Sequence, residues 1–300
     1  MSSTVTFARG DVRAEIIAGE GALLSNLEID GLSVLAETPW ANTVSSSSTP
    51  ALDEISWVNR WRGGWQLCAP NTGSANAETE RAAFHGAASQ ANWNIVEQTD
   101  TTLKLSWMDA EGEIELVREW SFNGDSSVSV QTTATNKSSG KKPVGFAEHL
   151  ILGSNFLQPV QRGSVAKLTL CPASKILDLD YSGAPTGLVI ESAAMKGFTE
   201  LSTSQPAKVF VVSGSKTNSI SVQVDDWVAK VDWQGLDHAL VWQEFGTSAE
   251  APWNSEVFAL GIEPTNVPHG LGANEQDGPF LLPGETITWN TSVQFFRKED

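Results

Sequence analysis

The sequence predicts an all-β fold, a large antiparallel β-sandwich. Three observations lead to this fold class. Apolar and polar residues alternate along many short segments, turn residues separate those segments, and no apolar 3.6-residue period runs beyond about two helical turns. Alternation with a period of two buries one face of a strand and exposes the other, which suits two sheets packed face to face.

The predicted strands follow one another along the whole chain. Turn residues separate them, as at Asp30-Gly31 and Pro283-Gly284, because glycine accepts the backbone angles of a tight turn. No linker, repeat or composition break divides the chain, so we expect a single domain over residues 1–300. The clearest alternating segments are 4–7, 12–17, 103–107, 113–120, 128–130, 219–224 and 286–295.

Charge and composition exclude several classes of protein. The formal net charge is -17, with only 19 Lys and Arg, which argues against nucleic acid or an anionic membrane as a partner. The N-terminus lacks the basic and apolar regions of a signal peptide, and no apolar run approaches the length of a membrane span. Cys68 and Cys171 lie far apart in the sequence and form no Cys-x-x-Cys pattern. We therefore expect a cytoplasmic protein with free, buried thiols.

Tryptophan is the unusual component of the composition, with 12 Trp against a single Tyr. Indole rings fill β-sandwich cores, but they also form flat surfaces on which the C–H faces of a sugar ring can pack. Both interpretations stay open from the sequence. Trp65, Trp242 and Trp253 are the candidates for a sugar-stacking wall.

Two ionisable residues stand at the ends of apolar, strand-like segments. Glu263 follows an apolar run and precedes Pro264, and His149 lies between Phe146-Ala147-Glu148 and an apolar run. Burial raises the pKa of a carboxyl and lowers that of an imidazole, which tunes both groups for proton transfer near neutral pH. Glu263 and His149 are therefore the candidate acid–base pair.

Further candidates could hold a substrate. His85 precedes a glycine and could bind a substrate oxygen, and Asp237 could bind a sugar hydroxyl. Arg60 and Arg62 flank Trp61 just before a double glycine, where the backbone can approach a ligand closely. Because guanidinium groups bind carboxylate and phosphate well, this pair could anchor an anionic group.

Other catalytic signatures are missing from the sequence. The histidines have no metal-ligand spacing, no Gly-x-Ser-x-Gly elbow occurs, and no phosphate-binding or dinucleotide fingerprint is present. We expect neither a metal nor a cofactor.

Five segments in a fixed order are similar to those of a known family. They are Gly63-Gly64-Trp65 with Pro70-Asn71, then His85-Gly86, then Phe146-Ala147-Glu148-His149, then Gly261-Ile262-Glu263-Pro264, and finally Pro283-Gly284-Glu285 with Trp289. In this order they resemble the aldose 1-epimerase (galactose mutarotase-like) superfamily across most of the chain.

The resemblance implies a large antiparallel β-sandwich and a cofactor-independent isomerase. It implies Glu263 as general base, His149 as general acid and His85 as a substrate-binding imidazole. A small-molecule sugar is then the expected partner, and the protein is expected to be a monomer or homodimer. The family's Asn-His-x-Tyr-Phe stretch reads Glu148-His149-Leu150-Ile151-Leu152 here, which leaves the identity of the sugar open.

Two alternatives remain from the residues alone. One is a hexose-6-phosphate 1-epimerase, with Arg60 and Arg62 as the phosphate anchor. The other is a non-catalytic carbohydrate-binding β-sandwich in which Glu263 and His149 are structural. A glycoside hydrolase is disfavoured, because the sequence shows no second carboxylate to pair with Glu263.

Overall fold

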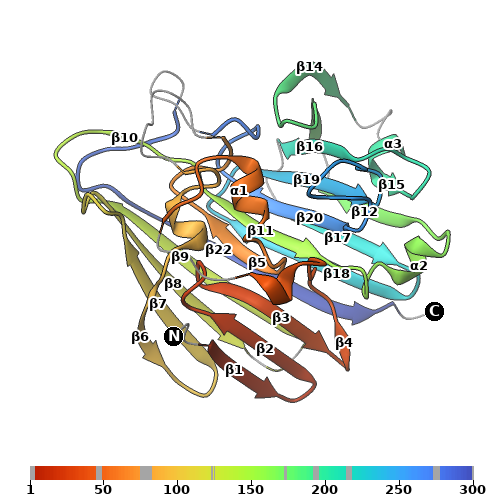
Figure 1. The fold of residues 1–300 in the computed structure, drawn as a ribbon, viewed down its shortest axis with the longest axis horizontal. Coiled ribbons are helices and arrows are strands. Elements are labelled where there is room, and N and C mark those ends of the chain that lie inside the picture. The colour runs from red at the N-terminus through yellow and green to blue at the C-terminus, as the bar shows by residue number, and fades with distance from the viewer. Residues whose placement is uncertain are drawn as a thin grey trace.

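Two large antiparallel sheets dominate the computed structural model of the protein, and they lie one behind the other in Figure 1. The structure describes residues 4–44, 49–74, 83–122, 124, 126–171, 174–191, 196–213, 218–272 and 278–298. Helical segments are short: α1 (Glu54–Val58), α2 (Gln158–Gln161) and α3 (Lys196–Thr199), with 3-10 helices η1 (Ala41–Thr43) and η2 (Ala87–Gln90).

Within the described residues one sheet has 11 strands and carries the candidate acid–base residues. Its spatial order is β1 (Thr4–Arg9), β2 (Val12–Ile17), β3 (Leu23–Ile29), β5 (Trp65–Cys68), β11 (Ala147–Leu152), β20 (Phe258–Thr265), β19 (His238–Phe245), β16 (Lys208–Ser213), β13 (Lys175–Leu179) and β14 (Pro185–Ile190), with β4 (Leu32–Ser33) paired to β3.

The second sheet has nine strands in the same described part of the chain, and a small two-stranded sheet accompanies it. Its order is β15 (Glu200–Leu201), β12 (Ala166–Leu170), β17 (Ser219–Val224), β18 (Trp227–Gln234), β22 (Thr286–Arg297), β9 (Ser127–Asn136), β8 (Ile114–Phe122), β7 (Thr102–Met108) and β6 (Asn94–Gln98), while β10 (Lys142–Pro143) pairs with β21 (Phe280–Leu281).

The predicted all-β sandwich is confirmed. All seven alternating segments lie in or overlap strands, and the bounds of β2 and β17 agree with the predicted segments 12–17 and 219–224. The predicted turn at Asp30-Gly31 joins β3 to β4 with φ of 50° and 76° at its two residues. Two consecutive positive φ angles are typical of the type I′ turn that closes a tight hairpin.

The main core lies between the two sheets, where side chains from both inner faces meet. Trp65 of β5 packs edge-on against Trp120 of β8, with ring centroids 4.9 Å apart, and Phe146 packs against Trp289 of β22 at 4.7 Å. Large apolar side chains such as these remove much surface from water and supply most of the stabilisation of a sandwich.

One buried ion pair crosses this core. Arg118 of β8 donates to both carboxylate oxygens of Glu148 in β11, at 3.1 and 3.0 Å, and both side chains are fully buried. Trp65, Trp289 and Thr132 donate to the same carboxylate at 2.9, 2.7 and 3.2 Å. A buried charge is tolerated when it is paired and hydrogen-bonded in this way, and this network ties β11 to the opposite sheet.

Two further expectations concern the thiols and the membrane. Cys68 and Cys171 are both buried and free, as predicted. Among the helices of the described segments, none combines the length and apolar character that crossing a membrane requires.

Candidate active site

Two neighbouring strands bring the candidate acid and base face to face. In the antiparallel pair β11–β20, Ala147 pairs with Thr265 and Leu150 pairs with Ile262. This register places His149 directly across from Glu263. Alternate residues of these strands point into the inter-sheet core, so both side chains project from the opposite, outer face of the 11-stranded sheet.

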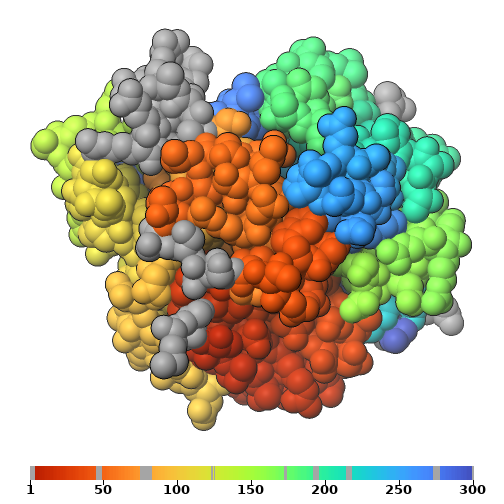
Figure 2. Space-filling model, viewed as in Figure 1, coloured from red at the N-terminus to blue at the C-terminus, as the bar shows by residue number. Residues whose placement is uncertain are grey.

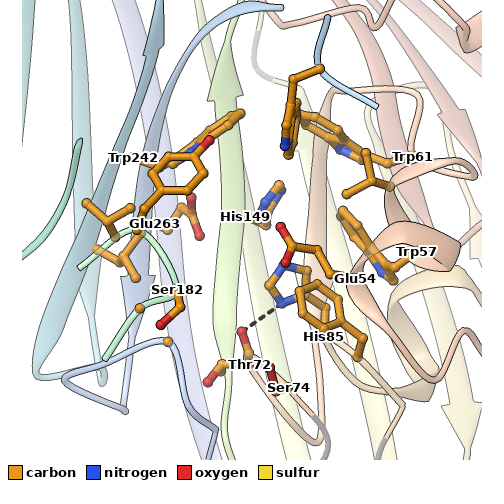
Figure 3. Close-up of a pocket in the computed structure, with 18 residues that line it drawn as sticks. Glu54, Trp57, Trp61, Thr72, Ser74, His85, His149, Ser182, Trp242 and Glu263 are labelled. Atoms are coloured by element: carbon orange, nitrogen blue, oxygen red, sulfur yellow. Dashed lines mark hydrogen bonds between the residues drawn. The ribbon is translucent and has the colours of Figure 1, made fainter. Parts of the chain in front are cut away.

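A cavity of about 170 Å³ lies on this outer face (Figure 3). It is smaller than the pockets that hold drug-sized ligands, and its size suits a single small ring compound. Its aromatic lining consists of Trp57, Trp61, Phe84, Tyr181, Trp242 and Trp253, and its polar side chains are Glu54, Thr72, Ser74, His85, His149, Ser182 and Glu263.

The short helix α1 and the residues after it form one side of the cavity, which we call the roof and which includes Trp57 and Trp61. Asp53 caps this helix by accepting a hydrogen bond from the backbone N–H of Ser56 at 2.8 Å. The helix then places Trp57 over the sheet, where it stacks on Trp61 with centroids 5.9 Å apart. In Figure 2 the light-blue surface of the segment after β19 abuts the orange surface of this roof.

Indole rings form a continuous wall around the acid–base residues. Trp61 meets Trp242 at 6.0 Å, and Trp242 meets Trp253 at 5.6 Å. The His149 imidazole lies edge-on to both Trp57 and Trp61, each at 5.6 Å. Because these rings exclude water from His149, its immediate environment is apolar.

His85 approaches from the loop below the helix and presents a defined tautomer. Its Nδ1 lies 2.7 Å from the carbonyl oxygen of Thr72. A carbonyl can only accept, so Nδ1 carries the hydrogen and Nε2 is left as an acceptor. Burial, partly offset by this bond, lowers the pKa of His85 to about 4, so the ring is neutral at physiological pH. The His85 and His149 rings lie 5.5 Å apart.

The electrostatics of the pair follow from burial. Desolvation, reinforced by the His85 ring, holds the pKa of His149 well below its usual range. Desolvation also raises the pKa of Glu263 to about 8. Near pH 7 the pair therefore holds one proton, and that proton resides on Glu263.

The Glu263 carboxyl is held over a glycine. Gly261 lies two residues earlier in β20, on the same face, and a Cβ added there would come within 2.5 Å of Glu263 Oε1. That same Cβ would meet Ile151 Cδ1 at 2.9 Å. Among the described residues, none donates a hydrogen bond to this carboxyl, although its side chain is only 6% exposed. A buried carboxyl without a partner, facing a cavity, is available to a ligand.

The structure brings five of the nine predicted site residues together and places Trp65, Arg60, Arg62 and Asp237 elsewhere. Glu263, His149, His85, Trp242 and Trp253 all line the cavity. Trp65 does not: it is 0% exposed and points into the inter-sheet core, where its indole N–H donates to Glu148. The prediction of a sugar-stacking role for Trp65 is therefore corrected to a role in the core.

Arg62 and Asp237 also lie away from the cavity. Arg62 pairs with Glu20, at 2.5 Å from Nε to Oε2, and its terminal nitrogens donate to the carbonyls of Ala41 and Val44. These bonds give Arg62 a structural role in holding the segment around η1, and they leave it unable to bind a ligand in the cavity. Asp237 is exposed at the turn before β19 and does not line the cavity.

Several lining residues were not predicted from the sequence. Glu54, Trp57 and Trp61 come from the α1 region, and the density of Trp between positions 57 and 65 was a usable signal for the two indoles. Tyr181 and Ser182 come from the turn between β13 and β14. No sequence pattern marks these two, because only the tertiary fold brings that turn to the cavity.

Comparison with known proteins agrees with this architecture. The sequence model of the aldose 1-epimerase family matches residues 3–294. No curated protein sequence matches the chain.

Solved structures share the fold at low sequence identity. A protein of Synechocystis sp. PCC 6803 is 16% identical, with a TM-score of 0.73 and coverage of 99% of this chain and 97% of that one. A galactose mutarotase-like protein of Lactobacillus casei is 15% identical, with a TM-score of 0.73 and coverage of 98% and 100%. A GalM/aldose epimerase homologue of C. elegans is 12% identical, with a TM-score of 0.68 and coverage of 100% of both chains.

Proposed function

The chain belongs to the aldose 1-epimerase family, and we propose that it is an isomerase that interconverts the α and β anomers of a free sugar. The observation that carries the proposal is the opposition of Glu263 and His149 across β11 and β20, inside a Trp-walled cavity. Fold likeness alone does not establish an activity, so the proposal rests on this site.

Anomer exchange needs one proton acceptor and one proton donor. Glu263 takes the proton of the C1 hydroxyl while His149 gives a proton to the ring oxygen, and the bond between C1 and the ring oxygen breaks. C1 becomes a carbonyl carbon. Rotation about the C1–C2 bond and closure on the other face return both protons, so no electrons are transferred and no net proton is consumed.

In the free protein, Glu263 and His149 have the protonation states that the mechanism requires after the sugar ring has opened. After ring opening, Glu263 is protonated and His149 is neutral, which is the arrangement that burial favours in the free protein near pH 7. In this state the Glu263 carboxyl can donate to the carbonyl oxygen at C1, and neutral His149 can accept from the released hydroxyl. The site is therefore adapted to the open-chain form, the reactive intermediate of the exchange.

The alternatives have less support from the cavity. A hexose 6-phosphate needs a cationic anchor, yet no Lys or Arg lines the cavity within the described segments, and Arg60 donates to the carbonyl of Thr49 at 2.6 Å. A purely structural role would leave Glu263 buried without hydrogen bonds to the described residues and with no function to offset that cost.

Polarimetry on freshly dissolved single anomers of several aldoses tests the proposal. We expect the protein to accelerate the approach to anomeric equilibrium with at least one aldose. As a control, the variant Glu97→Gln should keep the wild-type exchange rate, because it removes an exposed carboxylate on β6 of the other sheet. An exchange rate equal to the uncatalysed rate for every aldose would refute the proposal.

A further inference from the structure

The polar side chains of the cavity accept hydrogen bonds more readily than they donate them. The Glu54 carboxylate accepts only, and the tautomer fixed by Thr72 leaves His85 Nε2 as an acceptor. Protonated Glu263 can both accept and donate. No Lys, Arg, Asn or Gln lines the cavity within the described segments. The hydroxyls of serine and threonine can act either way. A ligand rich in donors therefore matches this lining better than one rich in acceptors.

Two other donors near the cavity are already used. The Tyr181 hydroxyl donates to the buried carboxylate of Glu244 at 3.1 Å, and the Trp57 indole N–H donates to Ser89 at 2.9 Å. These two donors are therefore not available to a ligand. The indole N–H of Trp61 is buried and has no partner among the described residues, so it can still donate to a ligand.

The charge of the cavity points in the same direction. Glu54 is exposed and lines the cavity, and the lining described above supplies no Lys or Arg to offset its negative charge. The whole chain is acidic as well, with a formal net charge of -17.

Aromatic faces add a further preference for positive charge. The quadrupole of an indole ring attracts a cation placed over its face, and ammonium ligands are commonly bound in aromatic cages. Trp57, Trp61, Trp242 and Trp253 surround this cavity. Figure 3 shows the Glu54 carboxylate beside Trp57, directed into the cavity, with Glu263 on the other side of His149.

We propose that the cavity selects a sugar that carries a protonated amino group, and that Glu54 is the residue that recognises this group. The C1 end of the sugar lies at Glu263 and His149, and the ammonium group lies between the Glu54 carboxylate and the indole walls. An ammonium group has three donors and no acceptor, which complements the acceptor-rich lining. The inference deepens the proposed function by naming its substrate class, and it rests on that function only for turnover.

Direct binding tests the inference independently of catalysis. Titration calorimetry with glucosamine, glucose and glucose 6-phosphate, below the pKa of the amine, compares three ligands that differ mainly in charge. A charge-assisted hydrogen bond should make glucosamine bind roughly tenfold to hundredfold more tightly than glucose. Glucose 6-phosphate should bind more weakly than glucose. Added salt should reduce the preference for glucosamine.

The variant Glu54→Gln keeps the shape of the side chain and removes its charge. It should reduce the ratio of glucose Kd to glucosamine Kd to within a few-fold of one. Glu97→Gln changes the net charge equally but lies on β6 of the other sheet, and it should preserve the ratio. Equal binding of both sugars by the wild type would overturn the inference, as would binding of neither sugar or an equal loss for both in Glu54→Gln.

The outcomes separate this inference from the proposed function. If glucosamine binds preferentially but no aldose exchanges its anomers faster, the substrate class stands and the isomerase proposal fails. If anomers of glucose exchange rapidly and glucosamine has no advantage in binding, the isomerase proposal stands and the inference about Glu54 fails.

Discussion

Glu148 and Glu263 are two buried carboxyl groups with opposite surroundings. Glu148 is 0% exposed and accepts five hydrogen bonds, two of them from Arg118. Glu263 is 6% exposed, and none of the described residues donates to its carboxyl. Each lies in a central strand of the 11-stranded sheet, one facing the inter-sheet core and the other facing the cavity.

The difference teaches that burial alone does not identify a functional carboxylate. Where partners are complete, as at Glu148, the charge serves the fold. Where partners are missing and a cavity is present, as at Glu263, the group is free to act on a ligand. Consecutive residues of β11 face the two environments: Glu148 faces the core, and His149, the proposed partner of Glu263, faces the cavity.

The largest expected effect falls on activity at the cavity face of β11. His149→Asn removes the proton donor but keeps a polar side chain of similar reach. We expect the rate of anomer exchange to fall about 10²- to 10⁴-fold, the usual contribution of general acid–base catalysis. Near-native thermal stability would accompany this loss. A variant with the wild-type exchange rate would remove His149 from the mechanism.

On the core face of the same strand the expected effect is on stability. Glu148→Gln leaves Arg118 buried without its counter-charge, which typically costs about 3–5 kcal/mol. Urea denaturation would report this as a lower midpoint, while any folded fraction keeps its exchange activity per active molecule. If the midpoint does not change, Glu148 is not the structural member of the comparison.

Gly261 offers an intermediate effect, acting on the position of the Glu263 carboxyl. In Gly261→Ala the new Cβ would lie 2.5 Å from Oε1, so the carboxyl must shift. Because a displacement of about 1 Å can cost 10²-fold, we expect kcat to fall roughly 10- to 100-fold, with a smaller change in KM. The matched control is Gly140→Ala, since a Cβ at Gly140 meets nothing within 4 Å. Equal kcat in both variants would exclude a positioning role.

The pH dependence sharpens the comparison further. Exchange requires one proton on the pair, so activity should fall about tenfold per pH unit as Glu263 loses its proton above about pH 8. On the acid side activity should fall only well below pH 6.5, where His149 becomes protonated. Exchange rates measured across this range would contradict the pair if the plateau continued far above pH 8.

The smallest expected effect is a gain of stability. The pKa of Glu263 is about 8 in the folded protein against 4.5 for an ordinary glutamate, so folding is favoured by protonation. Wild-type stability is then lost as pH rises from 4.5 through about 8. Glu263→Gln avoids this loss and should therefore melt a few degrees higher than the wild type at alkaline pH. Thermal melts of both proteins at several pH values measure it, and a difference that does not grow with pH would be inconsistent with a buried, protonated Glu263.

Much of the fold was predictable because its outer strands alternate. β2 and β17 have one buried and one more exposed face, and their period-two pattern identified both strands from the sequence. Central strands gave less information. β5 is buried along its whole length. Alternation therefore could not show that Trp65 faces the inter-sheet core while the next residue, Gln66, faces the opposite side of the sheet.

The candidate acid–base pair could be picked out from the sequence because ionisable residues in apolar strands are costly and therefore informative. Its register was not predictable, because pairing between β11 and β20 joins segments more than 100 residues apart. Arg62 was misjudged for a related reason: its partner Glu20 lies 42 residues away in sequence. Glu54 was missed because a carboxylate beside a helix cap looks like ordinary surface until the fold places it at the cavity.

The most direct test of the central claim is the exchange rate of Glu263→Gln, measured by NMR magnetisation transfer between the two anomers of the best sugar. The side chain keeps its shape and its place over Gly261 but can no longer accept a proton. We predict a rate at least about 10²-fold below wild type in a variant that is folded and as stable or more stable. Wild-type exchange in that variant would contradict the account, because the unpartnered carboxyl would then not be the group that performs the reaction.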